Sequence, residues 1–265
     1  MDIFIEVGIG LLVGLVMGAL GGGGAIITVP ALVYLLDQPP AVATTTSLVV
    51  VGITGVVSVV QHAMHGRIRW SDGLAFGLMG AGGAVLGARV STDADPRLVM
   101  GLFAVLLLLV AAVMWRRAGP NARTDPREMG SPWITWRPFS VSPRRALLVL
   151  VVASGVGVLT GFFGVGGGFA IVPALILVLR MPMALAVGTS LLVITINCAT
   201  GLLGRIGTDL HIDVGLVTVF VIMAVTGSLI GGWIGPRLDP SLLQRVFAGL
   251  LLLIAVYAGV NTALG

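Results

Sequence analysis

Charged residues are scarce in this sequence. Asp, Glu, Lys and Arg make up 10% of the 265 residues, whereas a soluble domain carries roughly 25%. Lysine is absent, so all fifteen basic residues are arginine. Hydrophobic residues make up 57% of the chain, and the mean hydropathy is +1.09. A chain with so few charges cannot cover a water-facing surface, so we predict an integral membrane protein.

Cysteine is nearly absent as well. Cys198 is the only one, which excludes a disulfide framework and a thiolate metal site. The three histidines lack metal-ligand spacing, and neither a zincin motif nor a phosphate-binding nucleotide loop occurs. The sequence therefore predicts no cofactor and no metal. It also lacks a constellation of nucleophile and base, so we do not expect an enzyme.

Carboxylates are missing from the middle of every apolar segment. The acidic residues nearest to these segments lie at segment ends or in loops: Glu6, Asp37, Asp72, Asp93, Asp95, Asp209, Asp213 and Asp239. This placement argues against a cation site built from carboxylates and against an Asp/Glu proton relay. The pI of about 10.5 does not indicate a nucleic-acid partner, because no basic face or aromatic platform is present.

Apolar segments are abundant. We identify ten: 4–20, 25–36, 41–63, 73–90, 97–115, 146–163, 168–179, 184–203, 214–234 and 242–260. The N-terminus lacks the basic region of a cleaved signal peptide, so the first segment is expected to remain as a span. Two segments, 25–36 and 168–179, are short. Twelve helical residues rise only about 18 Å, less than the ~30 Å hydrocarbon core. These two are partial spans, or one arm of a bent hairpin.

The sequence contains an internal repeat. Residues 14–32 recur as residues 157–175, with nine of nineteen positions identical. The match continues from 41–53 to 184–196 at the same offset of 143 residues, which becomes 144 further on. The repeat defines a first half, 1–115, and a second half, 146–265.

A polar linker, residues 116–145, joins the halves. It contains seven arginines and five prolines, and so many prolines argue against a continuous helix. Trp133 and Trp136 are expected at the headgroup level. Because cytoplasmic loops are rich in basic residues, we place this Arg/Pro-rich linker in the cytoplasm.

The arginines outside the linker favour ten crossings over eight. With ten crossings, Arg67, Arg69, Arg180 and Arg237 all lie on the linker side. With eight crossings, the two apolar segments on either side of each glycine cluster together form one span, and Arg180 and Arg237 move to the opposite side. Five segments per half is an odd number, so the second half enters the bilayer in the opposite sense. We therefore predict an all-α, multi-pass protein of two inverted five-segment repeats.

Two glycine clusters break the apolar pattern at matched positions and are candidates for substrate binding. They include Gly21, Gly23 and Gly24 in the first half and Gly164, Gly166 and Gly167 in the second. A break in the membrane survives only inside protein or beside a watery cavity, and N–H groups at a helix N-terminus suit an anion. The alternative is close helix packing through small residues, which fits Gly10, Gly14 and Gly18 well.

Hydroxyl groups follow each broken segment. Thr45, Thr46 and Ser47 in the first half correspond to Thr189 and Ser190 in the second. Such hydroxyls often bond back to a carbonyl of their own helix. Their recurrence favours two clusters that face a shared centre, where they would replace water around a small oxyanion.

Three further polar residues complete the candidate site: His62, Asn197 and Arg205. In the repeat His62 corresponds to Arg205, so a residue able to carry positive charge stands at one mouth of each half. The alternative for Arg205 is that its side chain snorkels to the membrane interface.

These motifs resemble the TauE/SafE family of sulfite-exporter-like permeases. The resemblance rests on the two Gly-x-Gly-Gly motifs, each followed by Pro-x-Leu, and on the Thr-Ser pairs that end at Ser47 and Ser190. The first copy has Ala25 where the second has Gly168. The resemblance covers nearly the whole chain outside the linker. It implies export of sulfite or an organosulfonate across a bacterial plasma membrane.

The working hypothesis is a secondary transporter that binds a small anion between the halves and moves it by alternating access. Proton coupling, if present, would use a protonated substrate or His62, and sulfite suits this because it interconverts with bisulfite near neutral pH. Alternatives are a transporter of a carboxylate or a metal ion, and a membrane subunit or sensor that works through its linker. Besides the substrate and the lipid bilayer no partner is indicated, and the oligomeric state stays open.

Overall fold

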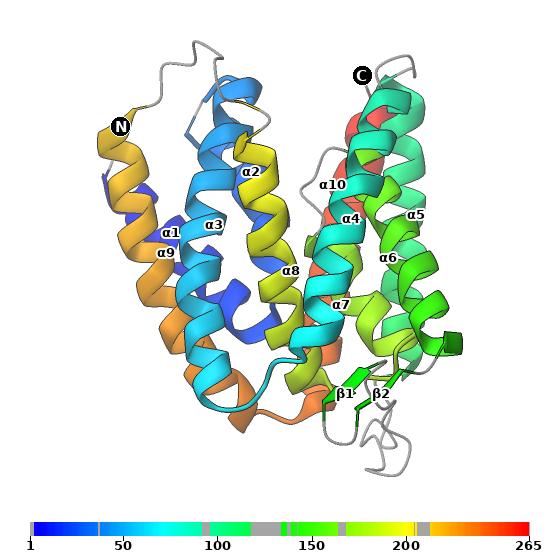
Figure 1. Cartoon of the computed structure of the whole chain (residues 1–265). Coiled ribbons are helices and arrows are strands. Elements are labelled where there is room, and N and C mark those ends of the chain that lie inside the picture. Colours follow the sequence, from blue (N-terminus) through cyan, green and yellow to red (C-terminus); the bar gives the residue numbers. More distant parts are fainter. Residues whose placement is uncertain are drawn as a thin grey trace.

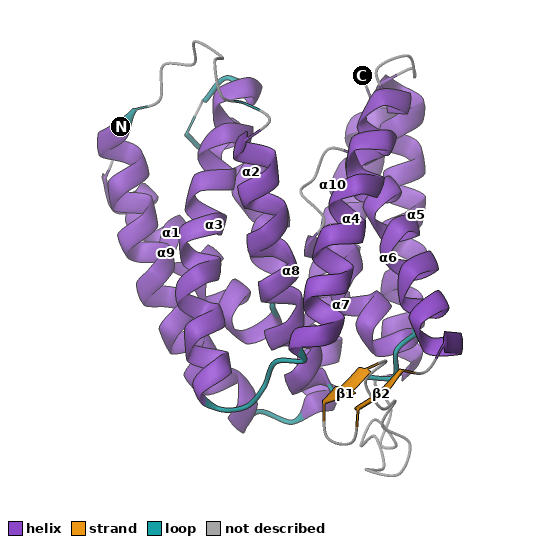
Figure 2. Ribbon diagram, viewed as in Figure 1, coloured by secondary structure: helices purple, strands orange, loops and turns teal. Residues whose placement is uncertain are grey.

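The computed structural model describes residues 3–36, 38–91, 96–117, 134–136, 139–141, 143–163, 168–203, 205 and 213–264. These residues form ten α-helices, a single 3₁₀ turn and a two-stranded hairpin (Figures 1 and 2). The helices are α1 (Ile3–Leu20), α2 (Gly23–Tyr34), α3 (Pro40–Met64), α4 (Trp70–Ser91), α5 (Pro96–Arg117), α6 (Pro143–Phe163), α7 (Gly168–Leu177), α8 (Met183–Leu203), α9 (Val214–Ile234) and α10 (Pro240–Leu264). Each predicted apolar segment falls on one of them.

Proline and aspartate mark several of the helix starts. Pro40, Pro96, Pro143 and Pro240 are the first residues of α3, α5, α6 and α10. Proline is favoured there because the first turn needs no N–H donor from it. At α9 the carboxylate of Asp213 instead accepts hydrogen bonds from the backbone N–H groups of Gly215 and Leu216, at 2.9 and 3.2 Å, as an N-cap.

The linker contributes the one departure from an all-helical chain among the described residues. Strands β1 (Ile134–Trp136) and β2 (Phe139–Val141) pair antiparallel, with Trp136 opposite Phe139. The sequence analysis predicted no strands. The aromatic and β-branched residues on either side of Pro138 favour this short hairpin over a helix.

The helices pack side by side in pairs, of which α1 and α9 run parallel and α3 and α8 run antiparallel. The two chain ends lie at the end of the molecule opposite the β-hairpin (Figure 1). α1 packs along α9, α4 along α6, α5 along α10, and α3 along α8. α2 turns back on α1, so α1 and α2 form a hairpin and do not make one continuous span. The short second segment is therefore the arm of a bent hairpin.

Glycines bring the backbones of α1 and α9 close together. A Cβ on Gly14 or Gly18 would overlap the carbonyl of Ala224 or Ser228. On the facing helix, a Cβ on Gly227 would overlap the carbonyl of Leu11. The helix-packing interpretation of Gly10, Gly14 and Gly18 is thus confirmed, because all three lie against α9.

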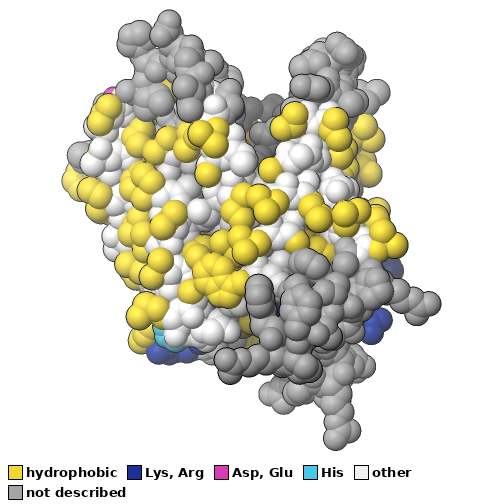
Figure 3. Space-filling model, viewed as in Figure 1, with side chains coloured by type: hydrophobic (Ala, Val, Ile, Leu, Met, Phe, Trp, Pro, Cys, Tyr) yellow, Lys and Arg dark blue, Asp and Glu magenta, His cyan; other side chains and the backbone are white. Residues whose placement is uncertain are grey.

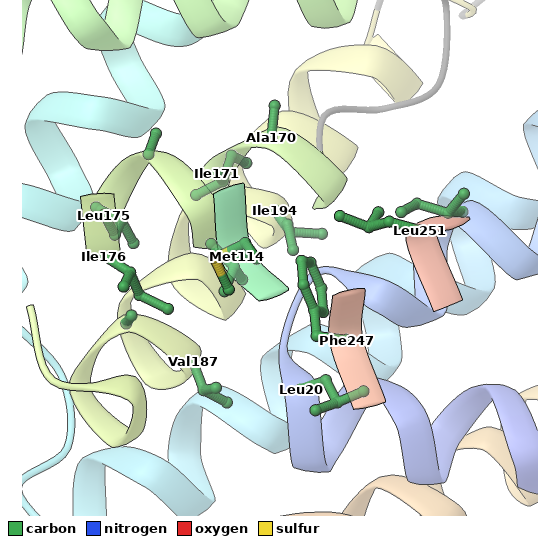
Figure 4. Close-up of a cluster of buried hydrophobic side chains, with 14 of the residues drawn as sticks. Leu20, Met114, Ala170, Ile171, Leu175, Ile176, Val187, Ile194, Phe247 and Leu251 are labelled. Atoms are coloured by element: carbon green, nitrogen blue, oxygen red, sulfur yellow. The ribbon is translucent and has the colours of Figure 1, made fainter. Parts of the chain in front are cut away.

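The buried core lies where helices of both halves meet. Figure 4 shows side chains from α1, α5, α7, α8 and α10 packed together: Leu20, Met114, Ala170, Ile171, Leu175, Ile176, Val187, Ile194, Phe247 and Leu251. Met114, Leu175, Ile194, Phe247 and Leu251 are fully buried. This core holds α7 in place against α8 and so fixes the broken segment of the second half.

The outer surface is apolar too. Hydrophobic side chains spread over the visible face between its two ends, and the Arg and His side chains seen there gather at the lower end (Figure 3). Four helical stretches in the described part of the chain are long and apolar enough to cross a membrane: Val42–Met64, Met183–Leu203, Val214–Arg237 and Pro240–Tyr257. Shorter apolar stretches lie at Glu6–Leu20, Gly101–Arg116 and Leu147–Thr160. The chain is therefore a multi-pass membrane protein.

Candidate functional site

The glycine break of the first half touches the broken segment of the second. α1 ends at Leu20, and Gly21 turns the chain with φ of +76°, a conformation that favours glycine. A Cβ on Gly22 would overlap the backbone of Gly168, and one on Gly168 would lie 2.5 Å from the carbonyl oxygen of Gly22. The N-cap residue of α2 and the first residue of α7 thus meet backbone to backbone, which requires glycine on both sides.

Ser190 lies directly beside this break. A Cβ built on Gly21 would collide with Ser190 Oγ and would also approach the carbonyl of Val187. Ser190 is fully buried, and its hydroxyl donates to that carbonyl at 2.8 Å. Gly21 of the first half and Ser190 of the second half therefore lie side by side. The hydroxyl cluster at Thr45 does not join them, because it lies at the opposite end of the α3–α8 pair, where it contacts Arg205.

Two helix N-termini converge at this contact. α2 begins at Gly23, and its N-cap Gly22 makes no side-chain hydrogen bond to the first turn. α7 begins at Gly168. Uncapped N–H groups and the positive end of the helix dipole make such a terminus favourable for an anion. Gly24, in the first turn of α2, packs against Met17 of α1, which holds the hairpin closed.

Arg205 reaches from the end of α8 to the start of α3. Its Nη1 donates to Thr44 Oγ1 at 3.0 Å and to Thr45 Oγ1 at 2.5 Å. The side chain is half-buried, and this burial lowers the pKa of its guanidinium, which still stays charged in a protein. Arg205 therefore binds the hydroxyl cluster of the other half.

His62 occupies the matching place at the opposite end of the helix pair. It is 3% exposed, its Nδ1 lies 2.9 Å from the Ser58 carbonyl, and its Cβ faces Gly188 at the start of α8. Next to it, Thr189 Oγ1 accepts a hydrogen bond from the backbone N–H of Arg69 at 3.1 Å. The end of each long helix thus lies on the start of its partner.

A comparison with known families covers nearly the whole chain. Residues 7–258 match a family described as "Sulfite exporter TauE/SafE". The chain belongs to the TauE/SafE family. None of the solved structures matches it significantly.

Relatives of this TauE/SafE chain span bacteria and archaea. A "Probable membrane transporter protein" of Xylella fastidiosa (strain Temecula1) is 33% identical over 97% of this chain and 94% of its own length. "Probable membrane transporter protein YunE" of Bacillus subtilis is 27% identical over 98% and 96%. "Probable membrane transporter protein MJ0441" of Methanocaldococcus jannaschii is 24% identical over 92% and 90%.

Asn197 is one of the site residues predicted from the sequence, and Thr54 is not. In this TauE/SafE structure, Asn197 Oδ1 and Thr54 Oγ1 are both buried without a hydrogen-bond partner. The two residues are 143 apart, the offset of the repeat. That match, together with the polar type of both residues, is the signal by which Thr54 could have been found.

The remaining predicted residues fall into two groups. Thr46 and Ser47 are buried in α3, at 1% and 6% exposure. Gly164, Gly166 and Gly167 lie outside the described residues. Among the residues that the structure describes, no group of three or more His, Cys, Asp and Glu side chains is arranged to hold a metal ion.

Proposed function

We propose that this protein is a secondary transporter that exports a small sulfur-containing anion, such as sulfite or an organosulfonate, by alternating access. The observation that carries the proposal is the contact of Gly21 and Gly22 with Ser190 and Gly168. It joins both broken segments and one hydroxyl pair at a single junction between the halves. The description of the family supports the sulfur-containing substrate.

The chemistry of this junction suits an oxyanion. Backbone N–H groups of α2 and α7 and the Ser190 hydroxyl are donors at the junction. Arg205 supplies positive charge at the other end of the α3–α8 pair, near the start of α3. Ser190 now donates to its own helix, and it would turn this donor to a substrate oxygen. Hydrogen bonds to a charged acceptor are roughly twice as strong as neutral ones, which favours that exchange.

Helix packing supports the inverted repeat. If the halves are related by a pseudo-two-fold axis, α1 corresponds to α6 and α9 to α4, and these are the pairs that pack together. The contacts agree residue by residue. Gly227 faces Leu11, whereas Gly83 faces Ser154, and Leu11 and Ser154 are 143 residues apart. In a ten-segment inverted architecture, a junction between the halves would lie near the bilayer centre.

Transport would proceed as the halves rock around the junction. The contact between Gly22 and Gly168 involves no side chains, so a small relative movement changes access without repacking a core. The linker, with its arginines, would face the cytoplasm of a bacterial cell. We expect no enzymatic step. Coupling to protons, if it occurs, would use bisulfite as the protonated substrate or His62.

Substrate class is tested by ligand-dependent stabilisation of the purified protein. Binding to the folded state alone raises the melting temperature by mass action. Sulfite, thiosulfate, taurine, acetate and a divalent metal ion are compared at equal ionic strength. The proposal expects stabilisation by sulfite or the sulfonate. Stabilisation only by acetate or by the metal ion would contradict it and would favour a transporter for those solutes.

A flux measurement in proteoliposomes separates transport from a sensor function. Labelled sulfite should cross the membrane with the wild-type protein. A membrane subunit that acts through its linker would show no flux, and its activity would be lost on deletion within 120–140 but not in Ser47→Ala and Ser190→Ala. Insensitivity of the flux to an imposed proton gradient would exclude coupling and leave facilitated efflux.

A further inference from the structure

A second polar site lies at the linker-side end of the helix bundle. A pocket of about 330 Å³ opens between the end of α3 and the segment where α9 passes into the 3₁₀ turn η1 (Gly235–Arg237). Its walls include Gln61, His65, Arg67, Trp233 and Arg237. In Figure 1 this end of α3 and α9 is the end that also carries the β-hairpin.

The charged side chains in the pocket wall are basic. Arg67 and Arg237 supply two guanidinium groups, and His65 adds an imidazole, while no carboxylate is among the described residues that line the pocket. The Arg237 guanidinium stacks on the Trp233 ring, 3.7 Å from its centroid, and donates to the Trp233 carbonyl. An arginine has five N–H donors. The bond to the carbonyl therefore fixes the Arg237 guanidinium, and its other N–H groups remain available to the pocket.

Gln61 connects the pocket with the interior. Its Nε2 donates to the Leu229 carbonyl at 2.9 Å, which fixes the amide, and its Oε1 is buried with no partner. A buried acceptor without a partner is unfavourable, so this oxygen is suited to receive a donor. A protonated oxyanion such as bisulfite, or a water that accompanies an anion, provides one.

A polar stripe continues from Gln61 along α3. Ser47, Thr54 and Gln61 are spaced by seven residues, about two helical turns, so they share one face of the helix. Thr54 is fully buried, and its hydroxyl has no partner, whereas that of Ser58 bonds back to its own helix at 2.8 Å. The stripe ends at Ser47, in the hydroxyl cluster of the first half.

We infer that this pocket is the linker-side capture site for the transported oxyanion, and that Thr54 is a step on its path to the centre. The inference rests on the proposed transport function. Arg67 and Arg237 raise the local anion concentration, Gln61 accepts from a protonated substrate, and the Thr54 hydroxyl donates to it further in. Thr54 is therefore assigned as a positioning residue of the path.

The kinetic test uses sulfite transport from the linker side, in inside-out vesicles. Arg67→Gln/Arg237→Gln should raise KM roughly tenfold, as loss of electrostatic focusing predicts, and leave the maximal rate unchanged. High salt should reduce the difference between this variant and the wild type. Thr54→Val should lower the maximal rate and leave KM nearly unchanged. The control Arg116→Gln/Arg245→Gln removes the same charge from two exposed arginines outside the pocket.

The binding test uses Trp233 as the reporter. In a variant with Trp70, Trp115, Trp133 and Trp136 changed to Phe, sulfite should alter the Trp233 emission at saturable concentrations. Adding Arg67→Gln/Arg237→Gln should abolish the response, whereas Arg116→Gln/Arg245→Gln should not. Inorganic phosphate is the second probe, and vesicles with phosphatidylglycerol or with phosphatidylcholine alone are the third.

The outcomes separate this inference from the proposed function. A sulfite response at Trp233 without any flux would support the anion site while refuting transport. Normal flux with an unchanged KM in Arg67→Gln/Arg237→Gln would refute the capture site and leave transport intact. A response only to phosphatidylglycerol would assign the pocket to a lipid headgroup and overturn the inference.

Discussion

The guanidinium of Arg205, which follows α8, donates a hydrogen bond of 2.5 Å to the hydroxyl of Thr45 in α3. The two residues are 160 positions apart and belong to different halves of the chain. At the other end of the same helix pair, His62 of α3 faces Gly188 of α8. Each half thus places a nitrogen-bearing side chain on the start of the other half's long helix, and such contacts couple the halves.

Replacing Arg205 should weaken transport from the side where it lies. Arg205→Gln removes the positive charge, so we expect KM to rise roughly tenfold, in line with the loss of a charged hydrogen bond. Arg205→Lys keeps the charge but loses the planar set of donors. Its KM should therefore lie between those of the wild type and Arg205→Gln. Labelled-sulfite flux measures both variants. Equal KM values for Gln, Lys and Arg would contradict a role for the charge.

Ser190→Ala should weaken substrate binding, because it removes a donor beside Gly21. A hydrogen bond to a charged group is worth about 1.5–3 kcal/mol, which corresponds to a roughly tenfold to hundredfold loss of affinity. Thr200→Ala is the matched control. Thr200 makes the same type of bond, to the Asn197 carbonyl at 2.9 Å, on an exposed part of α8. Sulfite titration of thermal stability measures both, and equal affinities would remove Ser190 from the site.

Gly22→Ala should destabilise the protein, since its methyl group would overlap the Gly168 backbone. Overpacking of this kind costs about 1–3 kcal/mol. The control is Gly249→Ala in α10, where a Cβ meets nothing within 4 Å and alanine is the better helix former. Thermal unfolding in detergent should show a lower melting temperature for Gly22→Ala only. An unchanged value would mean that the broken segments are not in backbone contact.

Gly227→Ala and Gly83→Ala should destabilise the protein to a similar extent. A Cβ on Gly227 overlaps the Leu11 carbonyl, and one on Gly83 lies 2.6 Å from the Ser154 carbonyl. These are corresponding contacts if the repeat is inverted. Gly8→Ala, whose Cβ meets nothing within 4 Å, controls for glycine replacement in a helix. A large effect at one site and none at the other would argue against matched packing of the two helix pairs.

Most of the fold follows from hydropathy and the repeat. Each of the ten predicted segments falls on a helix. In lipid, an apolar segment satisfies the hydrogen bonds of its backbone N–H and C=O groups by forming a helix. The packing role of Gly14 and Gly18 could also be predicted, because helices in lipid approach each other closely only where their residues are small. The hairpin at Ile134–Val141 was not predicted, because six residues in two short strands give almost no periodic signal.

The candidate site was predictable in part. The meeting of Gly21 with Ser190 could be anticipated because both belong to repeated motifs. The partner of Arg205 could not, since a contact between residues 160 positions apart depends on how α3 and α8 pack. Thr54 was missed for a different reason. A lone threonine in an apolar helix normally bonds back to its own helix, and only the structure shows that its hydroxyl does not.

The most direct test of alternating access at this junction is entrance counterflow of labelled sulfite. Proteoliposomes loaded with unlabelled sulfite, handled without oxygen, are diluted into a trace of labelled sulfite. A carrier with one alternately exposed site accumulates label transiently above equilibrium, and we predict this overshoot for the wild type and Thr200→Ala and a clear reduction for Ser190→Ala. Absence of the overshoot in well-folded wild-type protein, or its full retention in Ser190→Ala, would contradict transport of sulfite through the junction of the two halves.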